Sequence, residues 1–305
     1  MTYQFARGEL FGEGIERVAH EEIDTAITHL TARSGDAGLH VHEARKSLKK
    51  LRALIRLVRG HDKRKFQTNN QAFRSLAHAL SQWREADVAH KTAQAFCARS
   101  RNKANIHRWR LICRALRPNH NGVLSSCKEM RRQSLPIVSA FNSAKRHLSI
   151  GKSKKKTNDF ELIRQGVRAV HRQMLRDFQA TKDGLSPDAS HEWRKSTKYH
   201  WYHIRLLERA MPRVLKPYRL KLEKLGEILG EEHDLADLMA FIGNLHLSEL
   251  TTADRTAIYR DIKDRRLKLR TRSLDLGETI ARESTNALLN RLETYLIDWH
   301  EDAAA

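Results

Sequence analysis

Residues 42–49 read HEARKSLK, and residues 191–198 read HEWRKSTK. Both segments continue to Ile-Arg-Leu, at residues 55–57 and 204–206, so the two copies stay 149 residues apart. The same offset relates Leu80-Ser-Gln-Trp-Arg-Glu85 to Leu229-Gly-Glu-Glu-His-Asp234. Because the spacing between these motifs is kept without net insertion, the chain is predicted to contain two similar units.

A polar and basic stretch separates the two copies. Residues 149–158 read SIGKSKKKTN and contain no large apolar side chain apart from Ile150, which is typical of a linker. We therefore predict two units, residues 1–150 and residues 151–305. Two similar units side by side would form a cleft between them.

The hydrophobic pattern predicts an all-α protein. Gly and Pro are scarce, with 14 and 5 in the chain, and apolar residues recur at i, i+3, i+4 and i+7. Glu85 and Asp234 occupy matching positions where a helix is expected to restart, and we interpret them as structural residues that cap a helix or hold a nearby Arg. Helices are predicted at residues 14–33, 40–60, 62–98 with a break near 81–85, 103–116, 121–148, 158–182, 188–209, 213–246, 252–275 and 278–300.

On a helix, the basic side chains of the first copy share one face: His42, Arg45, Lys46, Lys49, Arg52 and Arg56. At about 1.5 Å of rise per residue this face is roughly 21 Å long. No regular acidic partner is expected along it, and like charges at i+3 and i+4 repel by a few tenths of a kcal/mol. Such a face is either solvated or neutralised by an anionic ligand, and its repetition favours the ligand. The opposite face is apolar and is predicted to enter a core: Leu48, Leu51, Leu54, Ile55 and Val58.

The second copy repeats the basic pattern with one change. Trp201 stands where the first copy has Arg52. A further series of Arg follows the linker at steps of four, of which we expect Arg168 and Arg172 to face the same ligand. Guanidinium groups suit phosphate because they donate two parallel N–H bonds. The second copy contributes His191, Arg194, Lys195, Lys198 and Arg205, with Tyr202 near the same face.

Composition indicates a polyanionic partner. The 57 Lys and Arg exceed the 36 Asp and Glu to give a net charge of +21, and 17 His add charge below neutrality. Nucleic acid, an anionic membrane and polyphosphate all satisfy this charge. The three Cys are odd in number and lack CxxC spacing, which argues against disulfides and a thiolate zinc site. With no apolar run of about 18 residues and no secretory signal, we expect a cytoplasmic protein without a membrane span.

The paired motifs HxxRKxxKxxR and HxxRKxxKxxxY, each followed by L-[SG]-x-x-[RH]-[ED], resemble the conserved histidine α-helical domain, or CHAD domain, over roughly residues 8–300. The resemblance implies two antiparallel four-helix bundles related by a pseudo-two-fold axis, with a basic central cleft that binds inorganic polyphosphate. Departures from the family pattern are Trp201 for Arg and Glu85 for Asp. The ligand contacts implied are His42, Arg45, Lys46, Lys49, Arg52, His191, Arg194, Lys195 and Lys198, with Tyr202 as the aromatic; helical phase adds Arg56, Arg168, Arg172 and Arg205.

Two other function classes remain open at this point. A nucleic-acid-binding protein would suit the charge, but the basic faces lack regular aromatic interleaving and no helix-turn-helix, zinc-finger or RNA-recognition signature occurs. An enzyme would need carboxylates or a metal motif such as HExxH, and the repeated faces are almost purely basic. Many relatives carry a triphosphate tunnel enzyme with an ExExK strand, which is not seen here. We therefore expect a stand-alone, non-catalytic polyphosphate-binding domain without metal or cofactor, acting on polyphosphate granules or on enzymes of polyphosphate metabolism.

Overall fold

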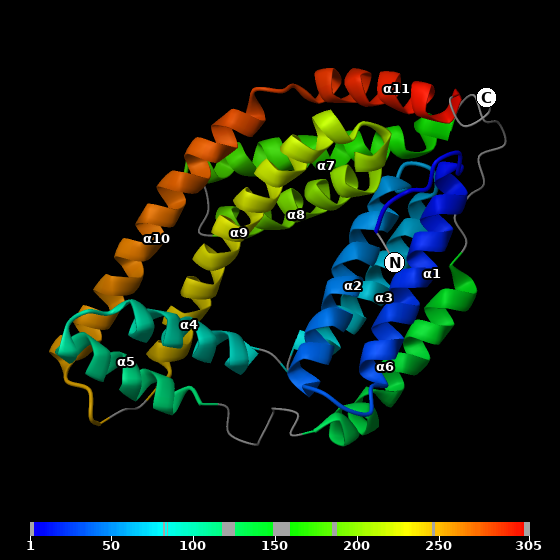
Figure 1. Ribbon diagram of the computed structural model, residues 1–305. Helices are drawn as coiled ribbons and strands as arrows, with labels where there is room; N and C mark the ends of the chain where they lie inside the picture. The colour runs from blue at the N-terminus through cyan, green and yellow to red at the C-terminus, as the bar shows by residue number, and fades with distance from the viewer. Residues whose placement is uncertain are drawn as a thin grey trace.

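The computed structural model describes residues 3–81, 83, 85–117, 126–148, 159–184, 188–245 and 248–301 (Figure 1). These residues contain no β-strand, and the predicted all-α class is confirmed. The predicted linker at residues 149–158 lies outside the described residues. The helices are α1 (Phe11–Leu30), α2 (Ala37–Leu57), α3 (Lys63–Ser81), α4 (Glu85–Arg99), α5 (Lys103–Ala115), α6 (Cys127–His147), α7 (Asp159–Lys182), α8 (Ala189–Leu207), η2 (Glu208–Ala210), α9 (Pro212–Gly243), α10 (Thr252–Ala281) and α11 (Thr285–Glu301).

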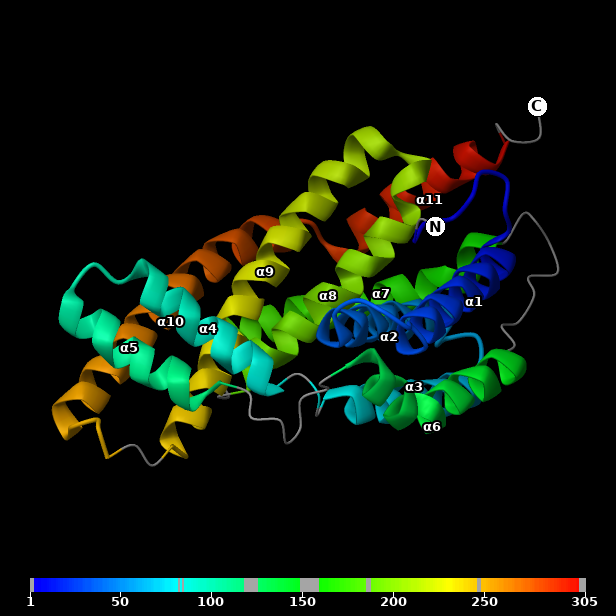
Figure 2. The same ribbon diagram turned by 60° about the horizontal axis from the view of Figure 1, so that its bottom comes forward.

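The first four-helix group consists of α1, α2, α3 and α6. Each helix packs against the next around the group, and α1 and α2 form one layer over α3 and α6 (Figure 2). The apolar face predicted for α2 enters the core, since Leu48, Leu51, Leu54 and Ile55 are all buried. This packing fixes the rotation of α2, so its basic face must point away from the first group's core.

The second group consists of α7, α8, α9 and α10, with α11 packed on α7. The helices α7 and α8 follow α1 and α2 at nearly the offset that relates the two sequence motifs. The two groups meet where α2 contacts α7 and α8. The buried ring of His203 donates from Nε2 to the carbonyl oxygen of Ala53 at 2.9 Å across this junction. Burial lowers the pKa of His203 to about 4, so this His is neutral and joins helices instead of binding anions.

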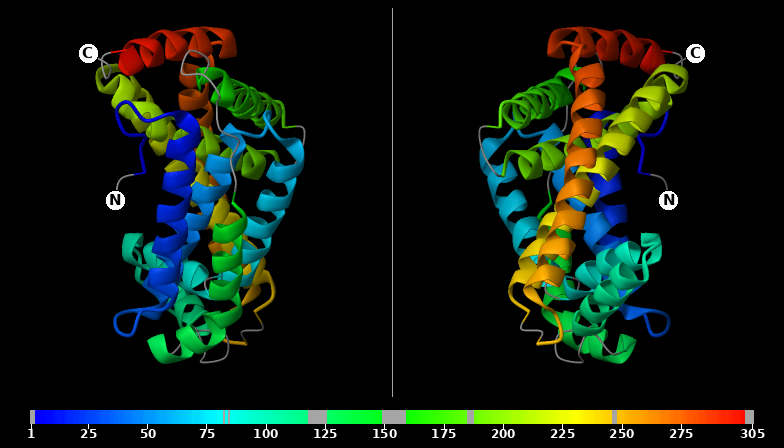
Figure 3. Two further views of the ribbon diagram at one scale, coloured as in Figure 1. Left: turned by 90° about the vertical axis from the view of Figure 1, so that its right-hand side faces the viewer. Right: turned by 90° about the vertical axis from the view of Figure 1, so that its left-hand side faces the viewer.

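The hydrophobic cores divide the molecule differently from the sequence repeat. The α4–α5 hairpin belongs to the first half of the chain but packs against α9 and α10 (Figure 3). Phe96 and Trp109 stack there at 4.4 Å between ring centroids, inside a core that also contains Leu238 and Ile262. The main core draws residues from both halves of the chain. Packing of the hairpin on the other half therefore ties the two repeat units together.

Two of the differences from the predicted helices bear on the packing. No helix begins at Asp234, because α9 runs continuously through that residue. Helix α4 does begin at Glu85, but the Glu85 side chain lies outside the described residues. The helix predicted to end at residue 275 continues to Ala281. Gly277 lies inside it, where a Cβ would come within 2.7 Å of Phe178 and Trp193, so this Gly allows close packing and does not end the helix.

Candidate functional site

A pocket of about 630 Å³ lies between α2, α4, α8 and α9, and we call it the central pocket. Both repeated His side chains, His42 and His191, line it. The two copies of the motif therefore face one space, even though they are far apart in the sequence. The full lining is His42, Arg45, Lys49, Val88, Ala89, His191, Arg194, His233, Asp234, Asp237, Ala240, Phe241 and Asn244.

Helix α2 supplies one wall of the central pocket through His42, Arg45 and Lys49, which follow each other at one and two turns. Arg45 also donates from Nη1 to the carbonyl oxygen of Leu80 at 3.2 Å. Leu80 lies in the last turn of α3, where carbonyl groups lack helical partners and attract cations. The end of α3 therefore holds the Arg45 side chain in position.

Helices α8 and α9 supply the opposite wall. The Nδ1 atoms of His191 and His233 lie 3.3 Å apart, with ring centroids separated by 4.4 Å. Arg194 passes over Gly230, where a Cβ would lie 3.5 Å from its Nε atom. His233 is also within 3.5 Å of the carboxylate of Asp237. The wall thus places two His and one Arg beside a carboxylate.

The two His side chains of this wall are neutral at pH 7. Burial is the main cause that lowers the pKa of His191, and the adjacent Lys195 and Arg194 lower it further. Burial also lowers the pKa of His233, although Asp237 acts in the opposite direction. Each of the two imidazole rings can therefore gain a proton when a bound anion stabilises its charged form, as water does for an exposed His.

A second pocket, of about 520 Å³, lies between α2, α3, α7 and α8, and we call it the side pocket. His191 lines both pockets, so the central pocket and the side pocket adjoin at this residue. Five cationic side chains face two carboxylates in the side pocket. Its lining includes Arg52, Arg56, Arg59, Asn70, Arg74, Gln173, Asp177, His191, Glu192, Lys195 and Tyr199.

The basic face of α2 continues from one pocket into the other. The guanidinium of Arg56 stacks 3.9 Å from the ring centroid of Tyr199 on α8, and Arg52 lies 6.0 Å from the same ring. Burial lowers the pKa of Arg56 to about 10, which still leaves it charged at neutral pH. The Nε atom of Arg52 is buried and has no hydrogen-bond partner within the described part of the chain. A ligand oxygen would satisfy this donor.

The expected lack of acidic partners is wrong for two of the repeated Lys. Lys46 lies 2.8 Å from Glu43 and Lys195 lies 2.5 Å from Glu192, each as an i,i+3 pair. Both Glu follow the motif His directly, so the pairing is repeated along with the basic residues. Lys46 lines neither pocket, whereas Lys195 lines the side pocket.

Three predicted site residues of α8 lie away from both pockets. Lys198 is half-buried against α9, where a Cβ on Gly226 would come within 2.8 Å of its Cε, and burial lowers its pKa. Its ammonium lies 5.0 Å from the Trp201 ring centroid, and the Arg205 guanidinium lies 5.5 Å from the same ring. Tyr202 is buried and meets Tyr3 edge to face. Trp201, the departure from the first copy, thus ends the basic face of α8.

The predicted Arg series on α7 also contributes little to the pockets. Arg168 and Arg172 line neither of them, and the Arg172 side chain is exposed. Arg164 is paired with Glu293 at 2.7 Å. A series at i+4 drifts around the helix, so successive members leave the face that α2 and α8 cover.

Several lining residues were not predicted. Tyr199 follows His191 and Lys195 at steps of four, so helical phase could have identified it. Arg59 and Arg74 lie outside the repeated motif, and no sequence signal distinguishes them from other surface Arg. His233 precedes Asp234 in the second copy of the repeat, so its place near the cleft could be expected from the sequence, but its contact with His191 depends on how α9 passes α8.

Comparison with known proteins places this arrangement in a family. The model of the CHAD domain matches residues 17–243. The chain belongs to the CHAD domain family. The structure of this CHAD protein is similar to the crystal structure of the CHAD domain from the plant Ricinus communis, with a TM-score of 0.50 and 16% sequence identity over 93% of this chain and 94% of that one. At this identity the similarity supports the fold alone. No curated protein matches the chain.

CHAD domains are binding domains, and the family is associated with inorganic polyphosphate. Among the described residues, no three His, Cys, Asp or Glu side chains are grouped so that they could hold a metal ion. Nor is any helix in the described part both long and apolar enough to span a membrane.

Proposed function

We propose that this CHAD protein binds inorganic polyphosphate along a path through the central pocket and the side pocket. The observation that carries this proposal is the placement of His42 and His191, together with Arg45, Lys49 and Arg194, around one pocket. The adjoining side pocket extends the cationic surface along α2. A polymer with one negative charge per repeat can contact both pockets at once, whereas a single small anion can occupy only part of the path.

Binding would draw on charge-assisted hydrogen bonds and on counterion release. Arg side chains donate paired N–H bonds to phosphate oxygens, and Lys49 supplies a mobile charge. Each phosphate neutralised by Lys or Arg releases condensed counterions, which makes affinity depend steeply on salt. The carboxylates Asp234 and Asp237 lie at the α9 side of the central pocket, so we place the polymer nearer to α2 and α8. We propose no catalytic step, and a binding role on polyphosphate granules or on polyphosphate-metabolising enzymes fits this chemistry.

Nucleic acid is the alternative ligand, and Tyr199 argues against it. Tyr199 is the aromatic side chain of the side pocket, and the Arg56 guanidinium already covers its ring at 3.9 Å. The face of the ring that Arg56 covers is therefore not available for a base to stack on. In competition at equal concentrations of negative charge, long-chain polyphosphate should displace labelled DNA, while single-stranded or duplex DNA should not displace labelled polyphosphate. Displacement of polyphosphate by either DNA would contradict the proposal.

Affinity for polyphosphate is expected to rise as pH falls from about 7.5 to about 5.5, around the ordinary His pKa of about 6.5. His191 and His233 have lowered pKa values in the free protein, so they are neutral at pH 7. A bound polyanion favours their protonated forms and raises the pKa of each. Binding must then take up protons, because the bound protein holds more protons than the free protein at the same pH.

Calorimetry at pH 6 in buffers with different heats of ionisation measures this proton uptake directly. Replacing both residues in a His191→Gln, His233→Gln variant should reduce the uptake and flatten the pH dependence. The charged groups that act on the two His are Glu192, Arg194 and Lys195 on α8 and Glu232 and Asp237 on α9. Arg45 and Lys49 on α2 and Asp234 on α9 line the same pocket. Affinity of the unaltered protein that stays constant between pH 5.5 and pH 8 would remove the His pair from the contact surface.

A further inference from the structure

The exposed surface of α5 carries a second row of basic side chains, away from both pockets. Lys103, His107, Arg110 and Arg114 recur at steps of four, three and four, and all four are exposed. We call this row the outer stripe. It is roughly 17 Å long at about 1.5 Å of rise per residue. None of its members lines the central pocket or the side pocket.

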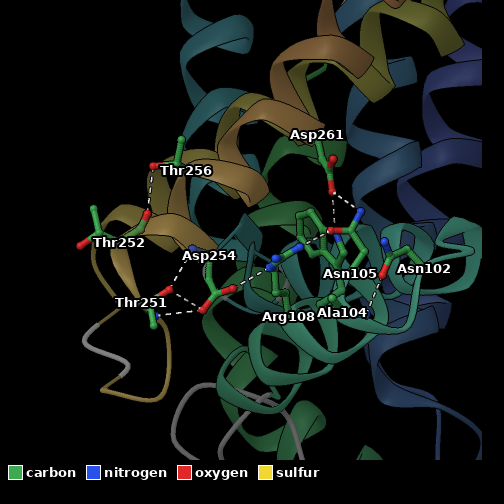
Figure 4. Close-up of polar contacts among 10 residues, drawn as sticks. Asn102, Ala104, Asn105, Arg108, Thr251, Thr252, Asp254, Thr256 and Asp261 are labelled. Atoms are coloured by element: carbon green, nitrogen blue, oxygen red, sulfur yellow. Dashed lines mark hydrogen bonds and ion pairs between the residues drawn. The ribbon is translucent and has the colours of Figure 1, made fainter.

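Polar contacts on the opposite side of α5 fix the direction in which the outer stripe points. Arg108 donates to Asp254 at 2.7 Å, and Trp109 and Asn105 donate to Asp261 at 3.1 Å and 3.2 Å (Figure 4). At about 100° per residue these three side chains lie roughly 180° around the helix from the outer stripe. Because α10 holds that side, the stripe is presented to solvent.

The charge of the outer stripe is not neutralised within the described structure. Helix α5 contains no Asp or Glu. None of the four stripe side chains forms a hydrogen bond or ion pair with another described residue. By contrast, α10 has Asp264 and Asp275 among its exposed cations. A row of like charges at i+3 and i+4 destabilises a helix by a few tenths of a kcal/mol per pair, and an external anion would remove that cost.

We propose that the outer stripe is a second polyphosphate-binding surface, so that one protein molecule contacts two segments of polymer. This inference rests on the proposed function of the pockets. The stripe is one side chain wide and suits a single flexible strand of phosphates. Its one ring is the small imidazole of His107, because Trp109 points into the core against Phe96, so the stripe lacks the series of aromatic side chains on which successive bases stack. Polyphosphate therefore fits it better than single-stranded nucleic acid.

The outer stripe would bind more weakly than the pockets and act through bridging. Its side chains are exposed, so each contact is screened by salt and contributes little by itself. On a long polymer, however, the outer stripe can contact the polymer that already occupies the pockets, or it can contact a second polymer molecule. Such a second contact raises the overall affinity without any new type of contact. Long polyphosphate mixed with the protein should then form light-scattering assemblies, and short polyphosphate should not.

The test compares three full-length proteins: the unaltered chain, the stripe variant Lys103→Glu, Arg110→Glu, Arg114→Glu, and the control variant Lys263→Glu, Lys268→Glu, Arg272→Glu. The control residues are exposed on α10 and produce the same change in net charge. Affinity for short polyphosphate reports on the pockets, and light scattering with long polyphosphate reports on bridging. The stripe variant should keep its short-chain affinity within about threefold, since distant exposed charges are screened, but should lose most of the scattering. The control should keep both.

Each other outcome has a definite meaning. Scattering by the stripe variant equal to that of the control would overturn the bridging surface while leaving the pockets in place. If the unaltered protein does not bind short polyphosphate, the proposed function is wrong. If the stripe variant loses only duplex DNA binding and scatters normally with polyphosphate, the stripe is a nucleic-acid surface and the proposal is wrong. Circular dichroism of each variant checks that α5 remains folded.

Discussion

Replacing Lys49 and Arg194 together by Glu is expected to weaken polyphosphate binding at least about 100-fold, because each charge-assisted hydrogen bond contributes about 1.5–3 kcal/mol. The two residues approach the central pocket from different helices, α2 and α8. Reversing both charges removes two phosphate contacts and adds two repulsive carboxylates on either side of the polymer. Calorimetry with short polyphosphate at fixed salt measures the loss, and the salt dependence of affinity should become shallower because fewer counterions are released.

The matched control for this variant is Lys263→Glu with Lys268→Glu, which changes the net charge equally on the exposed surface of α10. It should bind within about threefold of the unaltered protein, since charges beyond the Debye length are screened. A Lys49→Gln, Arg194→Gln variant separates the loss of contacts from the added repulsion and should fall between the two. If the Glu double variant keeps its helicity and binds as well as the control, the central pocket is not the polyphosphate site.

The first copy of the motif shows how far sequence reasoning extends. Helical phase divided α2 into an apolar side and a basic side, and burial of Leu48 and Leu51 orients the basic side toward the pockets. His42, Arg45 and Lys49 then line the central pocket as a straight helix would place them. This worked because α2 passes both pockets, and five of its six predicted basic residues line one or the other.

The second copy shows where the same reasoning stops. Lys198 follows His191 by about two turns and belongs nominally to the same side of α8. In the structure α9 comes so close at Gly226 that it covers Lys198, and Trp201 occupies the next position along the helix. Helical phase says which residues share a side but not where a neighbouring helix crosses it. Placement of Lys198 required the position of α9, and placement of Tyr202 required that of Tyr3.

The α4–α5 hairpin was also beyond prediction, for a related reason. The repeat suggests that each half folds on itself, and nothing in residues 85–115 indicates that they pack on the other half. The position of the hairpin is set by the packing of Trp109 and Phe96 between α9 and α10. It is also set by the hydrogen bonds from Arg108 to Asp254 and from Trp109 to Asp261. These are contacts between residues far apart in the sequence, and periodicity within one segment does not report them.

A close approach of α7 to α2 gives the second large prediction. Gly166 on α7 faces the C-terminal end of α2, where a Cβ would lie 2.0 Å from the carbonyl oxygen of Leu57 and 2.5 Å from that of Arg56. These neighbours are backbone atoms and cannot rotate away, so Gly166→Ala must push α2 and α7 apart. We expect a loss of about 3 to 5 kcal/mol in the free energy of unfolding, in the upper range for an overpacked core.

Gly230→Ala is the control, because Gly230 is also inside a helix but a Cβ there meets Arg194 at an ordinary 3.5 Å. That substitution should be neutral or stabilise the protein by up to about 1 kcal/mol through helix propensity. Thermal and urea unfolding measure both variants. Separation of α2 from α7 would also displace Arg56 from Tyr199, so folded Gly166→Ala should lose affinity at the side pocket. A Gly166→Ala protein as stable as the Gly230→Ala protein would mean that α2 and α7 do not approach this closely. It would also contradict the placement of α2 beside α8, which forms both pockets.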